Sequence, residues 1–169
     1  RKYFFNKLRD NNITLHTLLG NHDVAFKNTL EVNSTSLLLQ DYENIRIYDG
    51  FDSVMFDGVE IDIVPWLCSD NQDEIFTRIK NSTNQICFGH FEIDGFEMDR
   101  GNVCHGGIDK QPLNKYDIVL RGHFHHKSND GHIYQLLEKR RTRYVCEQQN
   151  TKKKFLFPGI YPILPINTA

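Results

Sequence analysis

The sequence predicts an α/β fold, and two patterns support this class. Short apolar segments rich in β-branched residues alternate with amphipathic segments of helical period along the 169 residues. Three of the apolar segments end in a glycine that is followed directly by residues able to bind a metal ion. We find no internal repeat, low-complexity segment or apolar run long enough to span a membrane. At this length the chain is one domain or a piece of one, large enough to bury a core.

Three segments are predicted to be helices. Residues 1–11 carry apolar side chains at helical spacing and stop at an Asp-Asn-Asn run. Residues 34–40 form a short helix that Asn33 or Ser34 caps. Residues 70–79 have an acidic first turn, which the positive end of the helix dipole stabilises.

Short strands are predicted where β-branched and aromatic residues gather between turn sequences. Residues 95–107 are rich in glycine and are expected to be a loop, and residues 131–136 are expected to be the return strand of a hairpin. The other predicted strands cover residues 13–19, 45–48, 54–56, 59–64, 85–88 and 117–121.

Cysteine usage indicates a reducing compartment. The four cysteines are far apart in the sequence and form no C-x-x-C pair, which argues against a zinc ribbon and against a small disulfide framework. Residues 1–8 contain no apolar core of the kind that a signal peptide needs. We therefore expect a cytoplasmic protein with reduced thiols.

The charge is unevenly distributed along the chain. Residues 1–135 hold 13 Lys and Arg against 20 Asp and Glu, a net charge of −7, whereas residues 136–169 hold 7 against 2, a net charge of +5. Such a shift marks a boundary or a change of origin. Clustered Lys and Arg side chains are usually only solvated, although they could also contact nucleic-acid phosphates.

The three strand ends with metal-binding residue types are the strongest functional signal. They read LLGNHD (Leu18–Asp23), CFGH (Cys87–His90) and LRGHFH (Leu120–His125). A lone histidine is more often structural than a ligand. In open α/β sheets, however, binding sites collect at the carboxyl ends of strands, and glycine there lets the backbone turn sharply. Three such ends in one short chain therefore predict a common site.

The spacing of the last two histidines suggests two metal ions. In an extended segment, His123 and His125 face the same side about 6.6 Å apart, at about 3.3 Å per residue. Each could bind one of two metal ions held about 3.5–4 Å apart, as in two-metal hydrolases. His126 faces the other side and is interpreted as an ordinary exposed histidine.

The residues after the first strand allow two interpretations each. Asn21 could be an amide-oxygen ligand, although asparagine is more often a turn or cap residue. His22 cannot easily share a metal ion with its direct neighbour, so it is free to act on substrate, for example on a departing oxygen. Asp23 could orient His22 or could be a turn carboxylate. Imidazole, amide and carboxylate together suit Mn, Fe or Zn rather than Ca or Mg.

The motif order resembles the metallophosphoesterase (calcineurin-like) superfamily. GNHD, then GH, then GHFH matches the last three motifs of that superfamily. Within it, the segments ITLHTLLGNHD, IDIVPWLCSDN, ICFGHFEIDGF and VLRGHFHH are similar to DNA-repair and recombination nuclease subunits of the SbcD type, above all to the recombination endonuclease subunits of T-even-like phages. The likeness covers residues 1–135.

The resemblance implies a calcineurin-like β-sandwich flanked by helices. It also implies an enzyme that hydrolyses DNA with two Mn²⁺ ions, as an exonuclease on double strands and an endonuclease on single strands. It implies that Asn21, His90 and His123 bind one ion, that His125 binds the other, and that His22 is the catalytic histidine. The implied partners are DNA, an SMC-like ABC-type ATPase subunit and a second copy of the chain, with no membrane. A phage-encoded member would work in the host cytoplasm.

The chain departs from the superfamily pattern at its start. The superfamily begins with a D-x-H motif and then G-D-x-x-D or G-D-x-x-N, and neither stands ahead of GNHD here. Without these two motifs, one metal ion would have His125 as its only ligand from this chain, and the two metal ions would lack the carboxylate that bridges them. We therefore expect an N-terminally truncated fragment that lacks the first strands of the fold and has an incomplete active site.

The other end of the chain departs as well. After GHIYQL the family continues with a Gly-Thr/Ser-Pro turn and a strand, where this chain has LEKRRTRYVCEQQNTKKK. We expect a nuclease domain over residues 1–135 and a basic tail over residues 136–169 that is not homologous to the family. The tail is either the product of a shifted reading frame or a variable segment that contacts DNA.

Three functions stay open. The chain is a DNA nuclease subunit, another metallophosphoesterase acting on nucleotides or phosphoproteins, or a non-catalytic remnant. The net charge of −7 over residues 1–135 slightly favours the second, since it does not indicate a nucleic-acid surface. The nuclease-type segments around Trp66 and Phe91–Phe96 favour the first more strongly. Trp66 and Phe91 themselves are expected in the core rather than as base-stacking platforms.

Overall fold

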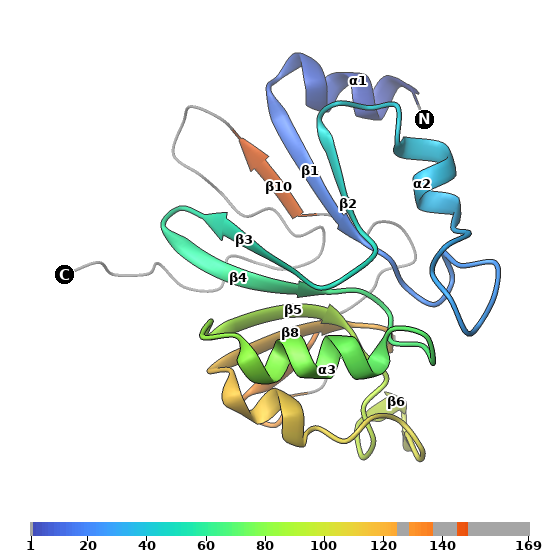
Figure 1. Ribbon diagram of the computed structural model, residues 1–169, viewed down its shortest axis with the longest axis vertical. Coiled ribbons are helices and arrows are strands. Elements are labelled where there is room, and N and C mark those ends of the chain that lie inside the picture. The colour runs from blue at the N-terminus through green and yellow to red at the C-terminus, as the bar shows by residue number, and fades with distance from the viewer. Residues whose placement is uncertain (1, 125–128, 137–144, 149–169) are drawn as a thin grey trace.

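The computed structural model of the chain describes residues 2–124, 129–136 and 145–148. Helices and strands are mixed along these residues, and the strands form a three-stranded sheet, a five-stranded sheet and a two-stranded ribbon (Figure 1). The predicted α/β class is therefore confirmed.

The three-stranded sheet carries the first two helices. β1 (Ile13–Leu18) lies at its centre, parallel to β2 (Ile45–Tyr48) and antiparallel to β10 (Val145–Gln148). The helices are α1 (Lys2–Asp10) and α2 (Ser34–Leu39). Both helices are too short to be stable alone, so burial of their apolar faces against the strands holds them. The shared core consists of Phe5, Leu8, Leu15, Leu39 and Ile45.

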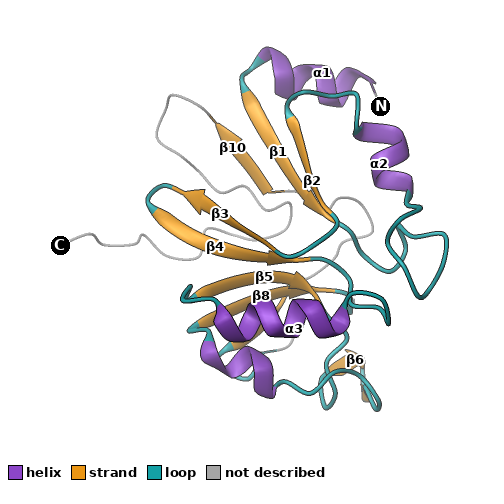
Figure 2. Ribbon diagram, in the orientation of Figure 1, coloured by secondary structure: helices purple, strands orange, loops and turns teal. Residues whose placement is uncertain are grey.

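The five-stranded sheet has the order β3-β4-β5-β8-β9. β3 runs antiparallel to β4, and the other neighbours in the sheet are parallel (Figure 2). Because parallel strands end at the same edge of a sheet, the segments that follow β4, β5 and β8 start side by side. The strands are β3 (Asp52–Phe56), β4 (Val59–Val64), β5 (Ile86–His90), β8 (Ile118–Gly122) and β9 (Ile133–Gln135).

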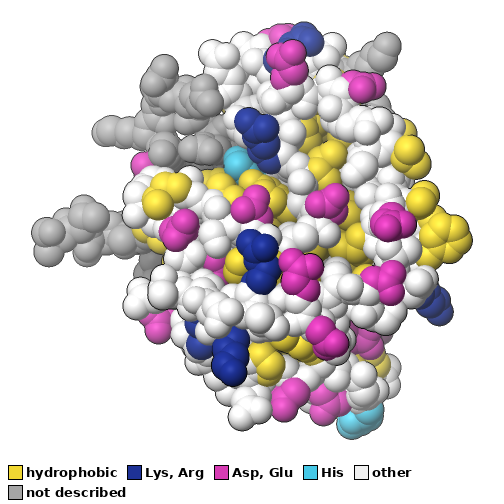
Figure 3. All heavy atoms as spheres, viewed as in Figure 1, with side chains coloured by type: hydrophobic (Ala, Val, Ile, Leu, Met, Phe, Trp, Pro, Cys, Tyr) yellow, Lys and Arg dark blue, Asp and Glu magenta, His cyan; other side chains and the backbone are white. Residues whose placement is uncertain are grey.

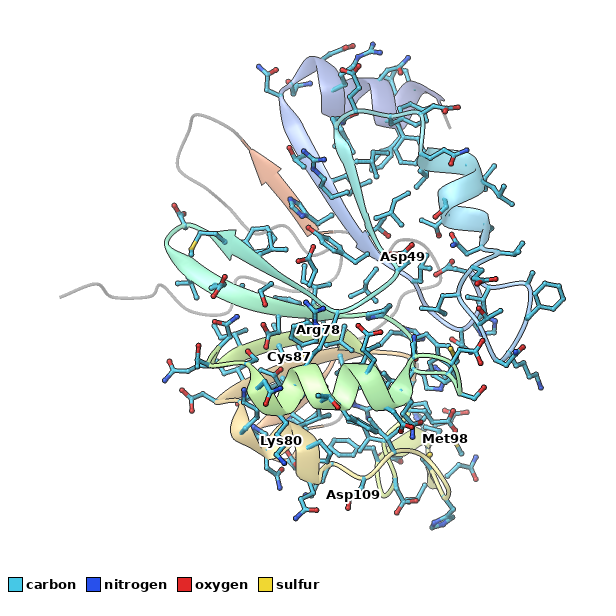
Figure 4. The ribbon with its side chains drawn as sticks, in the orientation of Figure 1. Asp49, Arg78, Lys80, Cys87, Met98 and Asp109 are labelled. Atoms are coloured by element: carbon cyan, nitrogen blue, oxygen red, sulfur yellow. The ribbon has the colours of Figure 1, made fainter. Side chains whose placement is uncertain are left out.

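Two helical segments pack on the five-stranded sheet. α3 (Gln72–Asn81) and the 3₁₀ helix η1 (Gln111–Lys115) contribute Ile79 and Leu113 to a core that includes Cys87 of β5. Figure 4 shows Cys87 beside α3. Burial raises the pKa of the Cys87 thiol well above its usual value, so this cysteine is a small buried hydrophobe.

A buried carboxylate joins the outer strands of this sheet to its helical layer. Asp62 of β4 is fully buried. Its oxygens accept hydrogen bonds from Ser53 Oγ at 2.8 Å, from Asn84 Nδ2 at 2.7 Å and from Tyr116 Oη at 2.7 Å. Burial, followed by the neighbouring Cys87 and Asp62, raises the pKa of Tyr116, so the phenol keeps the proton that it donates. A buried carboxylate with three donors is well satisfied.

The predicted hairpin at residues 131–136 is wrong. β9 runs parallel to β8, with Ile133 beside Val119. In a hairpin the second strand would run antiparallel to the first, so β9 is not the return strand of a hairpin with β8.

The glycine-rich segment 95–107 is also more regular than the predicted loop. It contains β6 (Glu97–Asp99) and β7 (Asn102–Val103), which pair antiparallel. Gly101 has a φ of 79° in the turn between them, a conformation that glycine adopts without strain.

The basic tail is described only at residue 136 and at residues 145–148, and the latter form β10 beside β1. The division into residues 1–135 and 136–169 stays a prediction, since most of the second part lies outside the described residues. Among the described helices, none is long and apolar enough to cross a membrane.

Candidate metal centre

The segments after three strands meet at one edge of the five-stranded sheet. β5 ends at His90, and His123 directly follows β8, its neighbour in the sheet. β1 belongs to the other sheet, but the Leu19 carbonyl beyond it accepts a hydrogen bond from the Trp66 N–H at 2.8 Å, just beyond β4. This backbone contact brings the turn that carries Asn21 to the same edge.

Asn21, His90 and His123 converge on one point. His90 Nε2 lies 2.9 Å from Asn21 Oδ1, and His123 Nδ1 lies 3.3 Å from the same oxygen. The two ring nitrogens are 3.2 Å apart. The residues are 33 to 102 positions apart in sequence, so the fold alone brings them together. The structure thus gathers three of the four residues predicted to bind metal.

The triangle has the size that a single divalent cation requires. Ligand atoms lie about 2.0–2.2 Å from a first-row metal ion, so neighbouring ligand atoms are about 3 Å apart. The observed separations of 2.9 to 3.3 Å match this. Two imidazole nitrogens and an amide oxygen suit a transition metal or manganese. Within the described part of the chain, no three His, Cys, Asp or Glu side chains form a ligand set. The candidate site at His90 and His123 therefore depends on the Asn21 amide as its third group.

A glycine before each histidine leaves room for the convergence. A Cβ on Gly122 would lie 3.2 Å from His90 Nδ1, and a Cβ on Gly89 would lie 2.1 Å from the Phe91 ring. His123 itself has a φ of 116°, which L-residues rarely adopt. Strained residues of this kind cluster at functional sites, because the surrounding structure must hold them there.

Aromatic rings border the two imidazoles. The Trp66 ring lies 5.1 Å from the His123 ring and 5.7 Å from the His90 ring, and the Phe124 ring lies 4.7 Å from His123. Phe91 is buried as predicted, whereas Trp66 is only half-buried and borders the site. Trp66 was predicted in the core, but it follows β4 at the edge where the histidines gather.

A carboxylate that sequence reasoning missed faces the other side of His123. Glu92 Oε2 lies 3.5 Å from His123 Nε2. Glu92 Oε1 accepts a hydrogen bond from Cys104 Sγ at 3.7 Å. Burial and the nearby Glu92 raise the pKa of Cys104, so the thiol keeps its proton. The available signal was the position of Glu92, two residues after a predicted ligand at a strand end.

A buried arginine that sequence reasoning also missed links β8 to the end of β5. Arg121 of β8 is fully buried, and its Nη1 donates to the Phe91 carbonyl at 2.8 Å. Its guanidinium lies 4.4 Å from the Phe96 ring centre and 4.9 Å from that of Phe124. Burial lowers the pKa of Arg121 to about 10. An arginine inside an apolar strand, directly before Gly-His, was the signal in the sequence.

The remaining predicted site residues lie outside the triangle. His22 is exposed next to Asn21. Asp23 Oδ2 accepts a hydrogen bond from the Gly20 N–H at 2.7 Å, which is the contact of a turn carboxylate. The predicted orienting role of Asp23 stays a prediction. His125 lies outside the described residues, so the second metal position also stays a prediction.

The chain is similar to a curated protein, "Exonuclease subunit 1" of Enterobacteria phage T4, with 43% identity over 118 residues. The matched region is 70% of this chain and 34% of that relative, so the chain spans about a third of the relative's length. No family model matches the chain. The chain is therefore related to a phage exonuclease subunit.

Proposed function

We propose that this chain contributes part of the active centre of a metal-dependent nuclease that hydrolyses DNA. The convergence of Asn21, His90 and His123 carries the proposal, because their separations and their chemistry are those that a divalent ion requires of its ligands. The related exonuclease subunit supports DNA as the substrate class. The motif order GNHD, GH and GHFH supports a calcineurin-like metallophosphoesterase domain over residues 1–135.

Two Mn²⁺ ions are the proposed cofactors. Asn21, His90 and His123 would hold one, and His125 would contribute to the other. A bound divalent ion would stabilise negative charge on the phosphate under attack. His22 stands exposed beside Asn21, where its imidazole can donate a proton to the departing oxygen. Asp23 would keep His22 in place through its bond to the Gly20 N–H.

We further propose that the chain acts in recombination and repair as one subunit of an assembly that includes an SMC-like ABC-type ATPase. The name of the relative, a subunit, supports an assembly. Exposed apolar side chains on α1 and α2 support contact with a second copy of the chain. They are Tyr3, Phe4, Leu37 and Leu38. Apolar side chains reach the surface on the side of α2 (Figure 3).

A phosphoesterase acting on nucleotides or phosphoproteins is the second candidate. The net charge of −7 over residues 1–135 favours it, and acidic side chains are scattered over the face shown in Figure 3. A nuclease of this charge would bind DNA mainly through its metal ions and less through a basic surface.

Hydrolysis assays with three substrates test the proposal. We expect the nuclease assembly that contains this chain to release nucleotides from linear duplex DNA in a Mn²⁺-dependent reaction. His90→Ala or His123→Ala in this chain should abolish that reaction. Hydrolysis of a mononucleotide or phosphopeptide without DNA cleavage would replace the proposal with the second candidate. If the chain binds Mn²⁺ but the assembly that contains it hydrolyses none of the three substrates, the chain is the non-catalytic remnant.

A further inference from the structure

We propose that Glu92 is a positioning residue that selects the tautomer with which His123 binds a cation. The inference rests on the proposed metal site at Asn21, His90 and His123. Its starting point is that the two nitrogens of the His123 ring face different neighbours. Nδ1 faces the Asn21 oxygen and His90, and Nε2 faces the Glu92 carboxylate.

Only one tautomer of His123 leaves a lone pair where a cation would be. A neutral imidazole carries its proton on one nitrogen and a lone pair on the other. With the proton on Nε2, the Nδ1 lone pair faces the triangle. With the proton on Nδ1, the ring would instead donate to Asn21 Oδ1 at 3.3 Å and could not be a ligand. Asn21 alone therefore favours the wrong tautomer.

Glu92 provides the opposing preference. Its Oε2 lies 3.5 Å from His123 Nε2, and an acceptor on that side favours a proton on Nε2. Metal-binding histidines commonly donate their second N–H to a carboxylate, which fixes both the tautomer and the ring orientation. The side chain of His123 is only 13% exposed, so water competes little for Nε2.

The surroundings of Glu92 hold its carboxylate in that position. Cys104, fully buried, donates its thiol to Oε1 and leaves Oε2 for His123. The Glu92 carbonyl accepts from the Ile108 N–H at 2.8 Å. Gly107 allows this close approach, since a Cβ there would lie 2.6 Å from the Glu92 carbonyl oxygen. The glycine-rich segment thus anchors the residue that orients the ligand.

The first test reads the tautomer without any metal ion. Long-range ¹H–¹⁵N NMR spectra of the chain should show the Nε2–H form of His123 as the major tautomer. Glu92→Ala should shift the population toward the Nδ1–H form, and the isosteric Glu92→Gln, which keeps an acceptor oxygen, should restore most of the Nε2–H form. Glu97→Gln is the matched control, because it removes the same charge from a nearby side chain. Glu97 Oε1 accepts from the Gly101 N–H within the β6–β7 hairpin.

The second test measures affinity for Mn²⁺ alone. Trp66 is the single tryptophan of the chain and lies beside both histidine rings, so its fluorescence reports binding at this site. Loss of an outer carboxylate partner typically weakens metal affinity by about 10–100-fold. We expect a loss of this size for Glu92→Ala, a smaller loss for Glu92→Gln, and none for Glu97→Gln.

The outcomes separate this inference from the proposed function. If His90→Ala abolishes Mn²⁺ binding while both Glu92 variants keep wild-type affinity and tautomer, the metal site stands and the role of Glu92 is overturned. If the wild-type chain binds no Mn²⁺ at this site, the proposed site and the inference both fail. Circular dichroism of each variant shows whether it is folded, and the isosteric Glu92→Gln decides the question if Glu92→Ala is not.

Discussion

His90 and His123 come from neighbouring parallel strands of one sheet, whereas Asn21 comes from a turn beyond the other sheet. His90 is buried to 1% exposure, while His22, the residue beside Asn21, is exposed. The positions of His90 and His123 are therefore fixed by the pairing of β5 with β8 and by the core around them. The turn side is set by a few local hydrogen bonds, including the one from the Gly20 N–H to Asp23.

This difference suggests a division of labour. Arg121 holds the Phe91 carbonyl from the neighbouring strand, and Asp62 fastens the outer strands to the helical layer. A histidine pair built on such a frame keeps its spacing, as the proposed metal site requires. Asn21 is only partly buried and His22 is exposed, so we expect this turn to move more easily than the histidine pair. The following predictions test this contrast.

The largest expected effect is on the frame of the five-stranded sheet. Asp62→Ala leaves the buried Tyr116 hydroxyl and the more accessible donors of Ser53 and Asn84 without their acceptor. We therefore expect the free energy of unfolding to fall by about 3 kcal/mol. Urea denaturation measures it. Asp49→Ala, an exposed aspartate labelled in Figure 4, should change stability by less than about 0.5 kcal/mol. Equal effects for the two variants would contradict the role of Asp62.

The second effect concerns metal affinity on the two sides. His90→Ala removes a buried imidazole ligand, and we expect Mn²⁺ affinity to fall by more than the roughly 100-fold upper range for an outer partner. Asn21→Ala removes a neutral oxygen that water can replace, so we expect a loss of about tenfold. Isothermal titration calorimetry compares them. A larger loss of Mn²⁺ affinity for Asn21→Ala than for His90→Ala would show that the turn, and not the histidine pair, is the rigid part of the site.

A third, smaller effect concerns the turn. Asp23→Ala removes the acceptor of the Gly20 N–H, and we expect it to lower the free energy of unfolding by about 1–2 kcal/mol. Mn²⁺ affinity should fall less than for His90→Ala, because the histidine pair is not disturbed. Thermal unfolding with and without Mn²⁺ measures both quantities. Loss of binding as complete as in His90→Ala would show that the turn, too, is part of the rigid frame.

The smallest effect is a dependence on pH at the edge strand of the sheet. Burial raises the pKa of Asp130, but the N–H groups of Ile133 and His132 and the Lys110 ammonium outweigh it, so the pKa lies below its usual value of 3.8. Because the folded-state pKa is depressed, Asp130 stabilises the fold above pH 3.8, and this contribution is lost as the pH falls through the lower folded value. Asp130→Asn should flatten the stability profile in that acidic range, and urea titrations at pH 2–5 would reveal it. An unchanged slope would refute this assignment.

The sequence predicted those features that depend on local pattern. The strands at residues 45–48 and 59–64 coincide with β2 and β4. Asn33 caps α2 by accepting from the Ser36 N–H at 2.7 Å, one of the two caps expected. The gathering of Asn21, His90 and His123 was also predictable, because the carboxyl ends of parallel strands share one edge.

The features that sequence reasoning missed depend on partners far away in the chain. β9 pairs in parallel with β8, and no local sequence pattern records the direction of this pairing. Glu92 reads as an ordinary surface glutamate until Cys104 and His123 are placed around it. Arg121 reads as an exposed strand residue until the rings of Phe96 and Phe124 enclose it.

The most direct test of the central claim is an anomalous difference map from crystals of the chain grown with Mn²⁺. We predict one peak about 2.0–2.2 Å from each of Asn21 Oδ1, His90 Nε2 and His123 Nδ1. Manganese bound only at surface carboxylates, with the Asn21–His90–His123 triangle free of any peak, would contradict the assignment of this site as a metal centre.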